Sequence, residues 1–301
     1  MSFSMRRHHA LVRASAAAVA TVAILGLTPT TQAAGKSFGW KVNGRQTAIY
    51  LVGSVHMLSQ DYYPLSAALE AAYKSSDLLV EEADLGEMLA PDAQMQFLTR
   101  SMLPADQSLD QLVSPATLAL VNKHVESTGL PFEPLKRFKP WAIALTLMAM
   151  EWQKAGFDAE LGLDKHFYDL AQTDGKTVQG LETVEYQISR FDGMTRDQQD
   201  RLLADTLKGF DTEMANVSKL ADAWKAGDAP AVERVVLQDL RQDPQMYERL
   251  LVERNRNWLP KLEALLTGQR PALVVVGAAH LVGPDGLLAL LKAKGFMVQQ
   301  L

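Results

Sequence analysis

The chain has 301 residues, a formal net charge of −5 and no cysteine. A chain without cysteine has no disulfides, no thiolate metal ligands and no cysteine nucleophile. An acidic chain without runs of basic residues is poorly suited to nucleic acid or an anionic membrane surface, so neither partner is expected.

The first 33 residues have the pattern of a signal peptide. Three arginines precede an apolar, alanine-rich stretch, Ala14–Leu27, and Thr31-Gln32-Ala33 fits a small-x-small cleavage site. An uncleaved anchor is the alternative interpretation of the same residues. We expect cleavage after Ala33, a periplasmic or secreted location, and one domain over residues 34–301.

The beginning of the mature chain predicts a hairpin followed by a helix and a strand. Asn43-Gly44 favours a type I′ turn, and the second arm of the hairpin, Thr47–Val52, is short, apolar and partly β-branched. A helix is expected over Leu65–Ser75 and a strand over Asp77–Glu81.

The middle of the chain is predicted to be mostly helical. Residues 90–130 indicate several short helices, and the apolar run Trp141–Met150 predicts a buried helix because it has about half the length of a membrane span. After a strand at Lys176–Leu181, residues 195–268 are charged and rich in alanine and leucine, which favours long helices.

The end of the chain returns to a strand, helix and strand pattern. The apolar run Ala272–Val276 predicts a buried strand, followed by a helix near Leu287–Lys294 and a last strand over Phe296–Gln300. Strands at both ends around a helical middle predict an α/β fold with a central mixed sheet and a large helical insertion.

Two glycine–histidine tetrads follow apolar strands at opposite ends of the chain. They are Gly53-Ser54-Val55-His56 and Gly277-Ala278-Ala279-His280. A glycine just past a strand allows a sharp turn, so each histidine can face the crevice beyond the carboxyl end of its strand, where open α/β sheets bind ligands. The tetrads predict a shared two-histidine site, and they make the two units candidate halves of a pseudo-duplicated sheet.

A third candidate ligand lies at the end of the second predicted strand. Glu81 and Glu82 point to opposite faces if the strand alternates, so at most one of them enters the crevice. Two imidazoles and a carboxylate can bind zinc, manganese, cobalt or iron. Such a metal lowers the pKa of a bound water and polarises a carbonyl group.

Structural interpretations of these residues stay open at this point. Either tetrad could be no more than a turn after a strand, and adjacent glutamates often form a solvated strand end. His124 lies in a polar helical stretch and His166 lies in the segment Asp164–Tyr168, and both are interpreted as surface or packing residues.

Taken together, the motifs resemble the TraB/PrgY/GumN family, which includes the TIKI proteins. The resemblance covers almost the whole mature chain. It depends on the two tetrads, on Glu82 with Asp84, on Gly162 with Asp164, on Gly180-Leu181-Glu182-Thr183 with Gln187, and on Arg254-Asn255. Its register favours Glu82 over Glu81, because an aspartate follows Glu82 two residues later.

The resemblance implies a metal-dependent hydrolase of the TIKI type, with manganese or cobalt as the metal and a peptide or protein as the substrate. It assigns His56, Glu82 and His280 as metal ligands. Glu182 would be a further ligand or a general base, Arg254 would stabilise an oxyanion or bind a substrate carboxylate, and Asn255 would orient that group or donate to the substrate.

Two other functions are also compatible with the sequence. A metal-free hydrolase could activate water directly with histidine and glutamate, as the similar erythromycin-esterase-like proteins suggest. A periplasmic protein that binds a peptide or haem, as the similar ChaN-like proteins do with haem, could use the two histidines as a ligand clamp. Fold similarity alone does not choose among these chemistries.

Overall fold

Six strands form one mixed sheet in the computed structural model, which describes residues 35–238 and 240–301. They are β1 (Gly39–Asn43), β2 (Ala48–Ser54), β3 (Leu78–Glu81), β4 (Thr177–Gly180), β5 (Ala272–Gly277) and β6 (Met297–Gln300). The strands lie in the order β4-β3-β5-β2-β1-β6. The neighbours β4, β3, β5 and β2 run parallel, whereas β1 runs antiparallel to both β2 and β6. The two strands that precede the tetrads are therefore adjacent and parallel.

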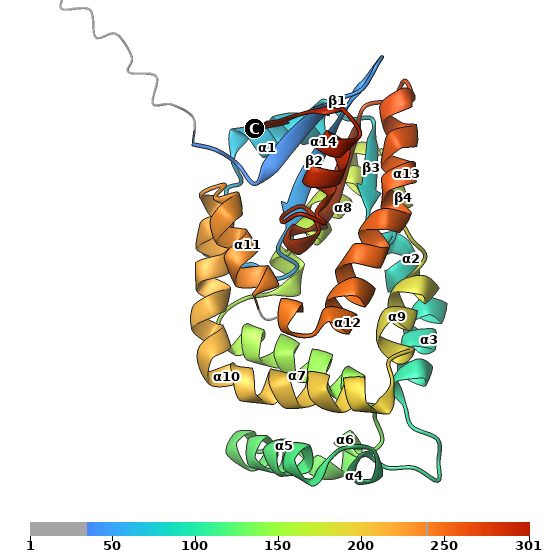
Figure 1. The fold of residues 1–301 in the computed structure, drawn as a ribbon, viewed down its shortest axis with the longest axis vertical. Helices are drawn as coiled ribbons and strands as arrows, with labels where there is room; N and C mark the ends of the chain where they lie inside the picture. Colours follow the sequence, from blue (N-terminus) through green and yellow to red (C-terminus); the bar gives the residue numbers. More distant parts are fainter. Residues whose placement is uncertain (1–34, 239) are drawn as a thin grey trace, which may run out of the picture. The chain divides into compact units, whose positions relative to one another are not determined.

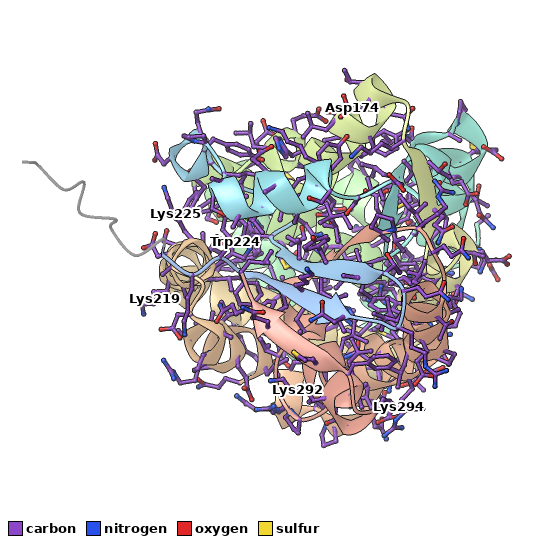
Figure 2. All side chains as sticks on the ribbon, turned by 90° about the horizontal axis from the view of Figure 1, so that it is seen from above. Asp174, Lys219, Trp224, Lys225, Lys292 and Lys294 are labelled. Carbon is purple, nitrogen blue, oxygen red and sulfur yellow. The ribbon has the colours of Figure 1, made fainter. Side chains whose placement is uncertain are left out.

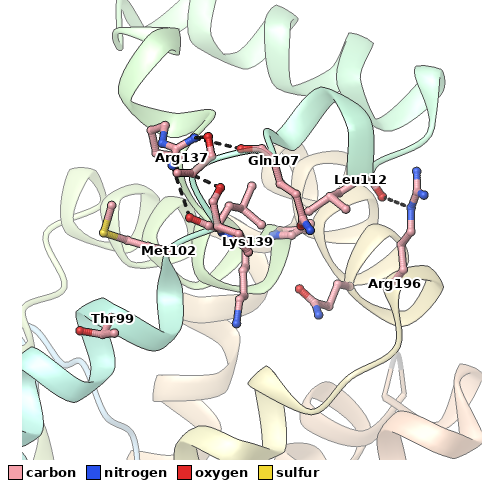
Figure 3. Close-up of a pocket in the computed structure, with 12 residues that line it drawn as sticks. Thr99, Met102, Gln107, Leu112, Arg137, Lys139 and Arg196 are labelled. Atoms are coloured by element: carbon pink, nitrogen blue, oxygen red, sulfur yellow. Dashed lines mark hydrogen bonds between the residues drawn. The ribbon is translucent and has the colours of Figure 1, made fainter.

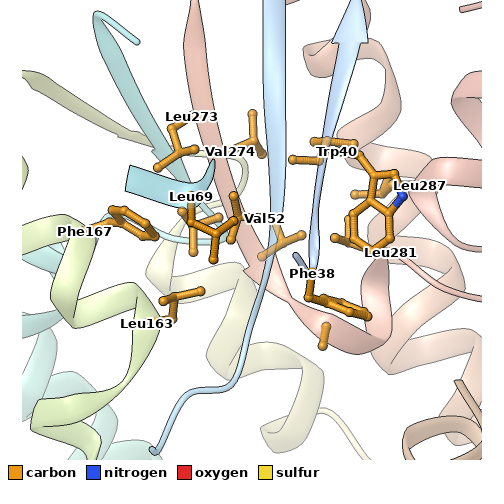
Figure 4. Close-up of a cluster of buried hydrophobic side chains, with 14 of the residues drawn as sticks. Phe38, Trp40, Val52, Leu69, Leu163, Phe167, Leu273, Val274, Leu281 and Leu287 are labelled. Carbon is orange, nitrogen blue, oxygen red and sulfur yellow. The ribbon is translucent and has the colours of Figure 1, made fainter. Parts of the chain in front are cut away.

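Helices cover both faces of this sheet. Helices α1 (Ala67–Lys74) and α8 (Leu163–Asp174) pack on one face, and α13 (Glu253–Thr267) and α14 (Leu287–Ala293) lie on the other (Figures 1 and 2). In the core, Leu69 and Phe167 approach the central strands from one side and Leu287 from the other (Figure 4). Every residue of β5 is buried, which explains its uninterrupted apolar sequence. The predicted α/β fold is confirmed.

The remaining helices form the predicted insertion, which is divided between two connections. The connection from β3 to β4 and the connection from β4 to β5 contain, besides α8 and α13, α2 (Leu85–Leu89), α3 (Pro91–Ser101), α4 (Leu109–Leu112), α5 (Pro115–Thr128), α6 (Phe132–Leu135), α7 (Pro140–Lys154), α9 (Val184–Asp192), α10 (Arg196–Lys225), α11 (Ala229–Leu237) and α12 (Pro244–Tyr247). Helix α7 packs along α10, and α5 packs on the same long helix (Figure 1). Their contact is a second apolar core that includes Val121, Ile143, Leu147 and Leu203.

The predicted helical stretch 195–268 is interrupted. Helix α10 begins with a capping box, in which Thr195 and Gln198 satisfy each other's backbone amides, and it ends shortly before Pro230. A π-helical turn, Glu248–Val252, leads directly into α13. Because prolines occupy first-turn positions of α11 and α12, new helices start there instead of one helix continuing.

The predicted hairpin is present, but its turn is different from the predicted type I′ turn. Strands β1 and β2 pair antiparallel from Gly39 opposite Val52 to Asn43 opposite Ala48, so the connecting loop has four residues. Gly44 does not adopt a positive φ. A β-carbon at Gly44 would lie 2.1 Å from the carbonyl oxygen of Leu266, so a close backbone approach, rather than a left-handed turn, explains this glycine.

Residues Gly35–Leu301 form one compact unit. Within the described ranges, no helix is long and apolar enough to cross a membrane. The predicted signal peptide lies outside the described residues, and pseudo-duplication of the sheet stays a prediction.

Candidate active site

His56 is held at the end of β2 by the first turn of α8. Its Nδ1 lies 2.8 Å from Oδ2 of Asp164, and the Ser54 hydroxyl donates to the same oxygen. Gly162 makes this approach possible, because a β-carbon there would lie 2.1 Å from the carbonyl oxygen of His56. The imidazole remains 61% exposed, so solvent reaches the site at His56.

Helix α10 fixes the same strand end from another direction. The indole Nε1 of Trp224 donates to the carbonyl oxygen of Gly53 at 2.6 Å, and the amide of Gly53 donates to the carbonyl oxygen of Phe38 at 3.1 Å. Trp224 is buried. Both the amide and the carbonyl oxygen of Gly53, three residues before His56, are therefore hydrogen-bonded.

His280 is held in one tautomer by two neighbouring residues of α13. Asn255 Oδ1 lies 2.7 Å from Nδ1 of His280, and Nη1 of Arg254 lies 3.0 Å from its Nε2. A guanidinium can only donate, so Nε2 accepts and the ring proton is on Nδ1. The Nδ2 group of Asn255 donates to the carbonyl oxygens of His280 and Asp285, which fixes the amide itself.

Glu82 lies just beyond β3 and contacts both the central strand and α13. Its Oε1 accepts from the amide of Gly277 at 2.7 Å, and its Oε2 accepts from Nη2 of Arg254 at 2.5 Å. Gln187 of α9 donates to Oε2 at 3.3 Å. Oε1 also lies 3.8 Å from Nε2 of His280.

Arg254 joins the two glutamates. Its Nε and Nη2 donate to Glu182, with Nη2 2.7 Å from Oε1, while Nη2 also contacts Glu82. Trp258 donates from Nε1 to Oε2 of Glu182 at 2.9 Å, and the centroid of its ring lies 4.6 Å from the guanidinium carbon of Arg254. Both oxygens of Glu182 are therefore occupied by residues of α13.

The backbone of Gly277 marks the point where the site residues converge. A β-carbon there would lie 3.1 Å from Oε1 of Glu82, 3.2 Å from Nε2 of His56 and 3.6 Å from Cδ2 of His280. These three side chains come from the ends of the adjacent parallel strands β2, β5 and β3. Because carboxyl ends of parallel strands share one edge of a sheet, three distant segments meet there.

The two imidazoles differ in their protonation. The Asp164 carboxylate raises the pKa of His56 to about 9. Burial lowers the pKa of His280 to about 3, and Arg254 adds to this effect. At neutral pH the structure therefore pairs a charged His56 with a neutral His280.

The carboxyl groups also differ in their environments. Burial opposes ionisation of Glu82, but the Arg254 guanidinium, the charged His56 and the amide of Gly277 hold the pKa of its carboxyl well below its usual range. Burial raises the pKa of Glu182 even though Arg254 contacts it. Glu82 is therefore a stable anion next to the imidazoles.

The donor set is suited to a divalent metal in several respects. Each imidazole has its Nδ1 held by a partner, Asp164 or Asn255, as is usual for metal-bound histidines. Nε2 of His56 and Oε1 of Glu82 both lie near Gly277. With neutral imidazoles, the carboxylates of Glu82, Glu182 and Asp164 exceed the charge of Arg254 by two, which balances a divalent cation.

One contact must change before a metal can bind there. Nη1 of Arg254 occupies the lone pair of His280 Nε2, and in the described part of the chain no three acidic, imidazole or thiol groups already stand at coordinating positions. The residues thus fit a divalent ion by their chemistry once Arg254 withdraws from His280.

The structure places the six predicted site residues in one cluster: His56, Glu82, Glu182, Arg254, Asn255 and His280. The other histidines discussed above lie elsewhere, with His124 3.7 Å from Glu151 and His166 3.5 Å from Glu70. Glu81 is buried but contacts the amide of Leu85 instead of the cluster.

Four residues of the cluster were not among the predicted site residues. Asp164 and Gln187 belong to the motifs quoted above, so the sequence contained a signal for both. Ser54 lies inside the first tetrad. Trp258 follows Arg254 by one helical turn, and only that spacing indicated that it would share a face with Arg254.

Comparisons with known proteins identify a family and relatives of this chain. The model of the TraB/PrgY/gumN family matches residues 38–300. The chain is 30% identical over 243 residues to "Uncharacterized protein YbaP" of Escherichia coli (strain K12), which covers 81% of this chain and 87% of that protein. The protein of the same name from Shigella flexneri matches equally. No solved structure matches the chain.

Proposed function

This chain belongs to the TraB/PrgY/gumN family, and we propose that it is an exported metal-dependent hydrolase that acts on peptides. The observation that carries the proposal is the convergence of His56, Glu82 and His280 around Gly277, with the Nδ1 of each imidazole already held. When bound, a divalent ion such as manganese, cobalt, zinc or iron would supply a Lewis acid and a water of lowered pKa.

The ligand residues proposed are His56, Glu82 and His280. Asp164 keeps His56 oriented through Nδ1, so the Nε2 of His56 is directed to the space beside Gly277. His56 must lose its Nε2 proton before it can be a ligand, because only a neutral imidazole nitrogen has a lone pair to give. The charge of Asp164 then contributes, with those of Glu82 and Glu182, to balancing the charge of the ion.

Arg254 is the proposed group for stabilising negative charge on a substrate. Its guanidinium lies within hydrogen-bond distance of Glu82, Glu182 and His280, in a buried position where a charge acts strongly. Withdrawal of its Nη1 from His280 would leave that group free to donate to an oxyanion. A carboxylate of the substrate is the second partner that this planar donor suits.

The contacts of Glu182 and Asn255 support positioning roles. Glu182 uses both oxygens to hold Arg254 and Trp258, and it stays compatible with a general base only if one of these contacts opens. Asn255 is fully buried and fixes the tautomer of His280. A direct contact of Asn255 with substrate would require loss of that bond.

A metal-free hydrolase is the second candidate, and the contact between Arg254 and His280 favours it. In that case the imidazolium of His56, paired with Asp164, is a proton donor, and Glu82 is an anion near the reacting atoms. This candidate differs from the first in its response to chelators, because it needs no ion.

Metal analysis of the purified, untagged protein tests the proposal. We expect about one divalent ion per chain in the wild type, and loss of the ion in His56→Ala and in His280→Ala while circular dichroism stays native. His124→Ala is the matched control, since His124 lies in the second apolar core region and should keep the ion. Wild-type protein that takes up no manganese, cobalt, zinc or iron would overturn the metal-dependent proposal.

Peptide cleavage then separates the remaining candidates. Cleavage of a peptide mixture that stops with a chelator and returns with added ion supports the metallopeptidase. Cleavage that is indifferent to chelator supports the metal-free hydrolase, and stoichiometric binding of peptide or haem without turnover supports a binding protein. N-terminal sequencing of exported protein tests the predicted cleavage after Ala33.

A further inference from the structure

Exposed apolar side chains are concentrated on one short segment. Of the large apolar side chains exposed in the described residues, all but Met297 lie between Met88 and Met102. Met95, Leu98 and Met102 are 62%, 44% and 40% exposed; Met95 and Leu98 lie three residues apart on one side of α3, and Met102 directly follows the helix. We call these three residues the apolar stripe. A local concentration of this kind is typical of an interaction site.

The apolar stripe leads into a pocket with a volume of about 740 Å³. Met102 belongs to both, and the other walls are the loop after α3 and the beginnings of α7 and α10 (Figure 3). The volume lies in the range of small-molecule and peptide side-chain sites, roughly 300–1,000 Å³. The stripe and the pocket are therefore parts of one continuous surface.

The charged residues that line the pocket are all cationic. They are Arg137, Lys139 and Arg196, and no aspartate or glutamate lines it. Lys139 is paired with Asp192 at 2.5 Å, but among the described residues neither arginine has an acidic partner within 4.0 Å. The pocket is thus a local positive site in a chain whose net charge is −5.

Backbone carbonyl groups hold the two arginines in place. Arg137 donates to the carbonyl oxygen of Gln107 at 2.9 Å and to others of the same loop, and Arg196 donates to that of Leu112 at 2.7 Å (Figure 3). Bonds to neutral carbonyls fix the position of a guanidinium without neutralising its charge. An anionic group that enters the pocket therefore meets charges that are already oriented.

We propose that the apolar stripe and this pocket form a docking site for a peptide segment that carries apolar side chains and a carboxylate. The carboxylate lies in the pocket with Arg137 and Arg196, and the apolar side chains lie on the stripe. Methionine side chains adapt to different shapes, so the site accepts a range of apolar sequences. The choice of a peptide as the occupant rests on the proposed peptide hydrolase function.

Helix α9 connects the docking site to the candidate active site. Asp192 at its end pairs with Lys139 of the pocket, and Gln187 of the same helix donates to Glu82. Arg100 of α3 contacts Asp192 and Glu185, which ties the stripe to this helix as well. Gln187 and Asp192 are about 7.5 Å apart along the helix axis. A docked peptide is thus held near the site proposed to cleave it.

Fluorescence anisotropy with two labelled decapeptides tests the docking site. Both peptides contain four leucines; one ends in two glutamates and a free carboxylate, and the other has glutamines and an amidated end. We expect at least tenfold tighter binding of the acidic peptide at low salt, decreasing as salt is added. Equal binding of both peptides would overturn the proposal.

Two variants and two matched controls locate the binding. Arg196→Gln and the double change Met95→Ser with Met102→Ser should each weaken binding of the acidic peptide at least fivefold. Arg45→Gln, at the β1–β2 loop, and Met297→Ser, on β6, replace exposed residues of the same types elsewhere and should change binding of the acidic peptide less than twofold. Equal weakening by the controls would overturn the location. If Arg196→Gln fails to fold, the double methionine variant still tests the location, because unchanged binding of the acidic peptide by that variant would overturn it.

Two further measurements distinguish peptide docking from the binding of a fatty acid and from cleavage. Dodecanoate is also an apolar anion. If dodecanoate displaces the acidic peptide at a concentration lower than the Kd of the peptide, the assignment of the site to a peptide is overturned. Mass spectrometry of the bound peptide detects cleavage independently of binding. Charge-dependent binding without cleavage would support the docking site while contradicting the proposed hydrolase, so the two can fail separately.

Discussion

Glu81 is a buried carboxyl group that the candidate active site does not use, and its titration should be visible in the stability of the fold. Its side chain is 2% exposed, Oε2 accepts from the amide of Leu85 at 3.0 Å, and Oε1 has no partner among the described residues. Burial raises the pKa of Glu81 from 4.5 to about 8. The folded protein therefore binds this proton more tightly than the unfolded chain.

The sign and size of the effect follow from that difference. The contribution of Glu81 is fully favourable below pH 4.5, and it is lost as the pH rises through 8, because the folded state must then bury a charge. At about 1.4 kcal/mol per pKa unit, the loss between pH 5 and pH 8 is about 3 kcal/mol in the free energy of unfolding. Glu81→Gln removes this dependence.

Urea unfolding of the wild type and of Glu81→Gln at pH 5 and pH 8 measures it. Glutamine leaves an unpaired amide in place of Oε1, but that cost is the same at both pH values and cancels in the comparison. We expect the free energy of unfolding of Glu81→Gln, relative to that of the wild type, to be about 3 kcal/mol higher at pH 8 than at pH 5. Glu126→Gln, an exposed change on α5, should show no such gain. Parallel pH profiles for the wild type and Glu81→Gln would refute the reasoning.

Three further changes test the site. Gly277→Ala should abolish uptake of a divalent ion, measured by calorimetric titration with manganese, with a native circular dichroism spectrum, because the added methyl contacts both a carboxylate and an imidazole. Asn255→Ala releases His280 Nδ1 and should weaken ion affinity about 10- to 100-fold in the same titration. Trp224→Phe removes the bond to Gly53 and should lower the free energy of unfolding by about 1–3 kcal/mol in urea. An unchanged value for any of these would contradict the role given to that residue.

The strands and the meeting of the two tetrads could be predicted because their signals are local. Short apolar runs ending in glycine indicate buried strands, and parallel strands bring their carboxyl ends together. The alternation of the strand that ends at Glu81 likewise separates Glu81 from Glu82, and only Glu82 contacts Arg254. These inferences need only the apolar runs, the glycines that follow them and the alternation of side chains along a strand.

Other features could not be predicted from the chain because they depend on distant contacts. Asp164 meets His56 only because α8, a helix that the sequence did not predict, starts at a glycine packed on the backbone of His56. Arg254 and Asn255 contact the two nitrogens of one ring, although they lie about 100° apart around their helix. The loop at Gly44 is set by Leu266, more than two hundred residues away.

The π-helical turn at Glu248–Val252 has a consequence for how related sequences are compared. It accommodates one residue more than a regular helix would, immediately before Arg254 and Asn255. A homologue with a one-residue gap in this stretch would turn the following side chains by about 100° relative to the preceding helix. Such a protein could keep an aligned arginine–asparagine pair and yet present neither residue to the histidine. The length of this segment, and not just the identity of the pair, is therefore a criterion for transferring the site between sequences.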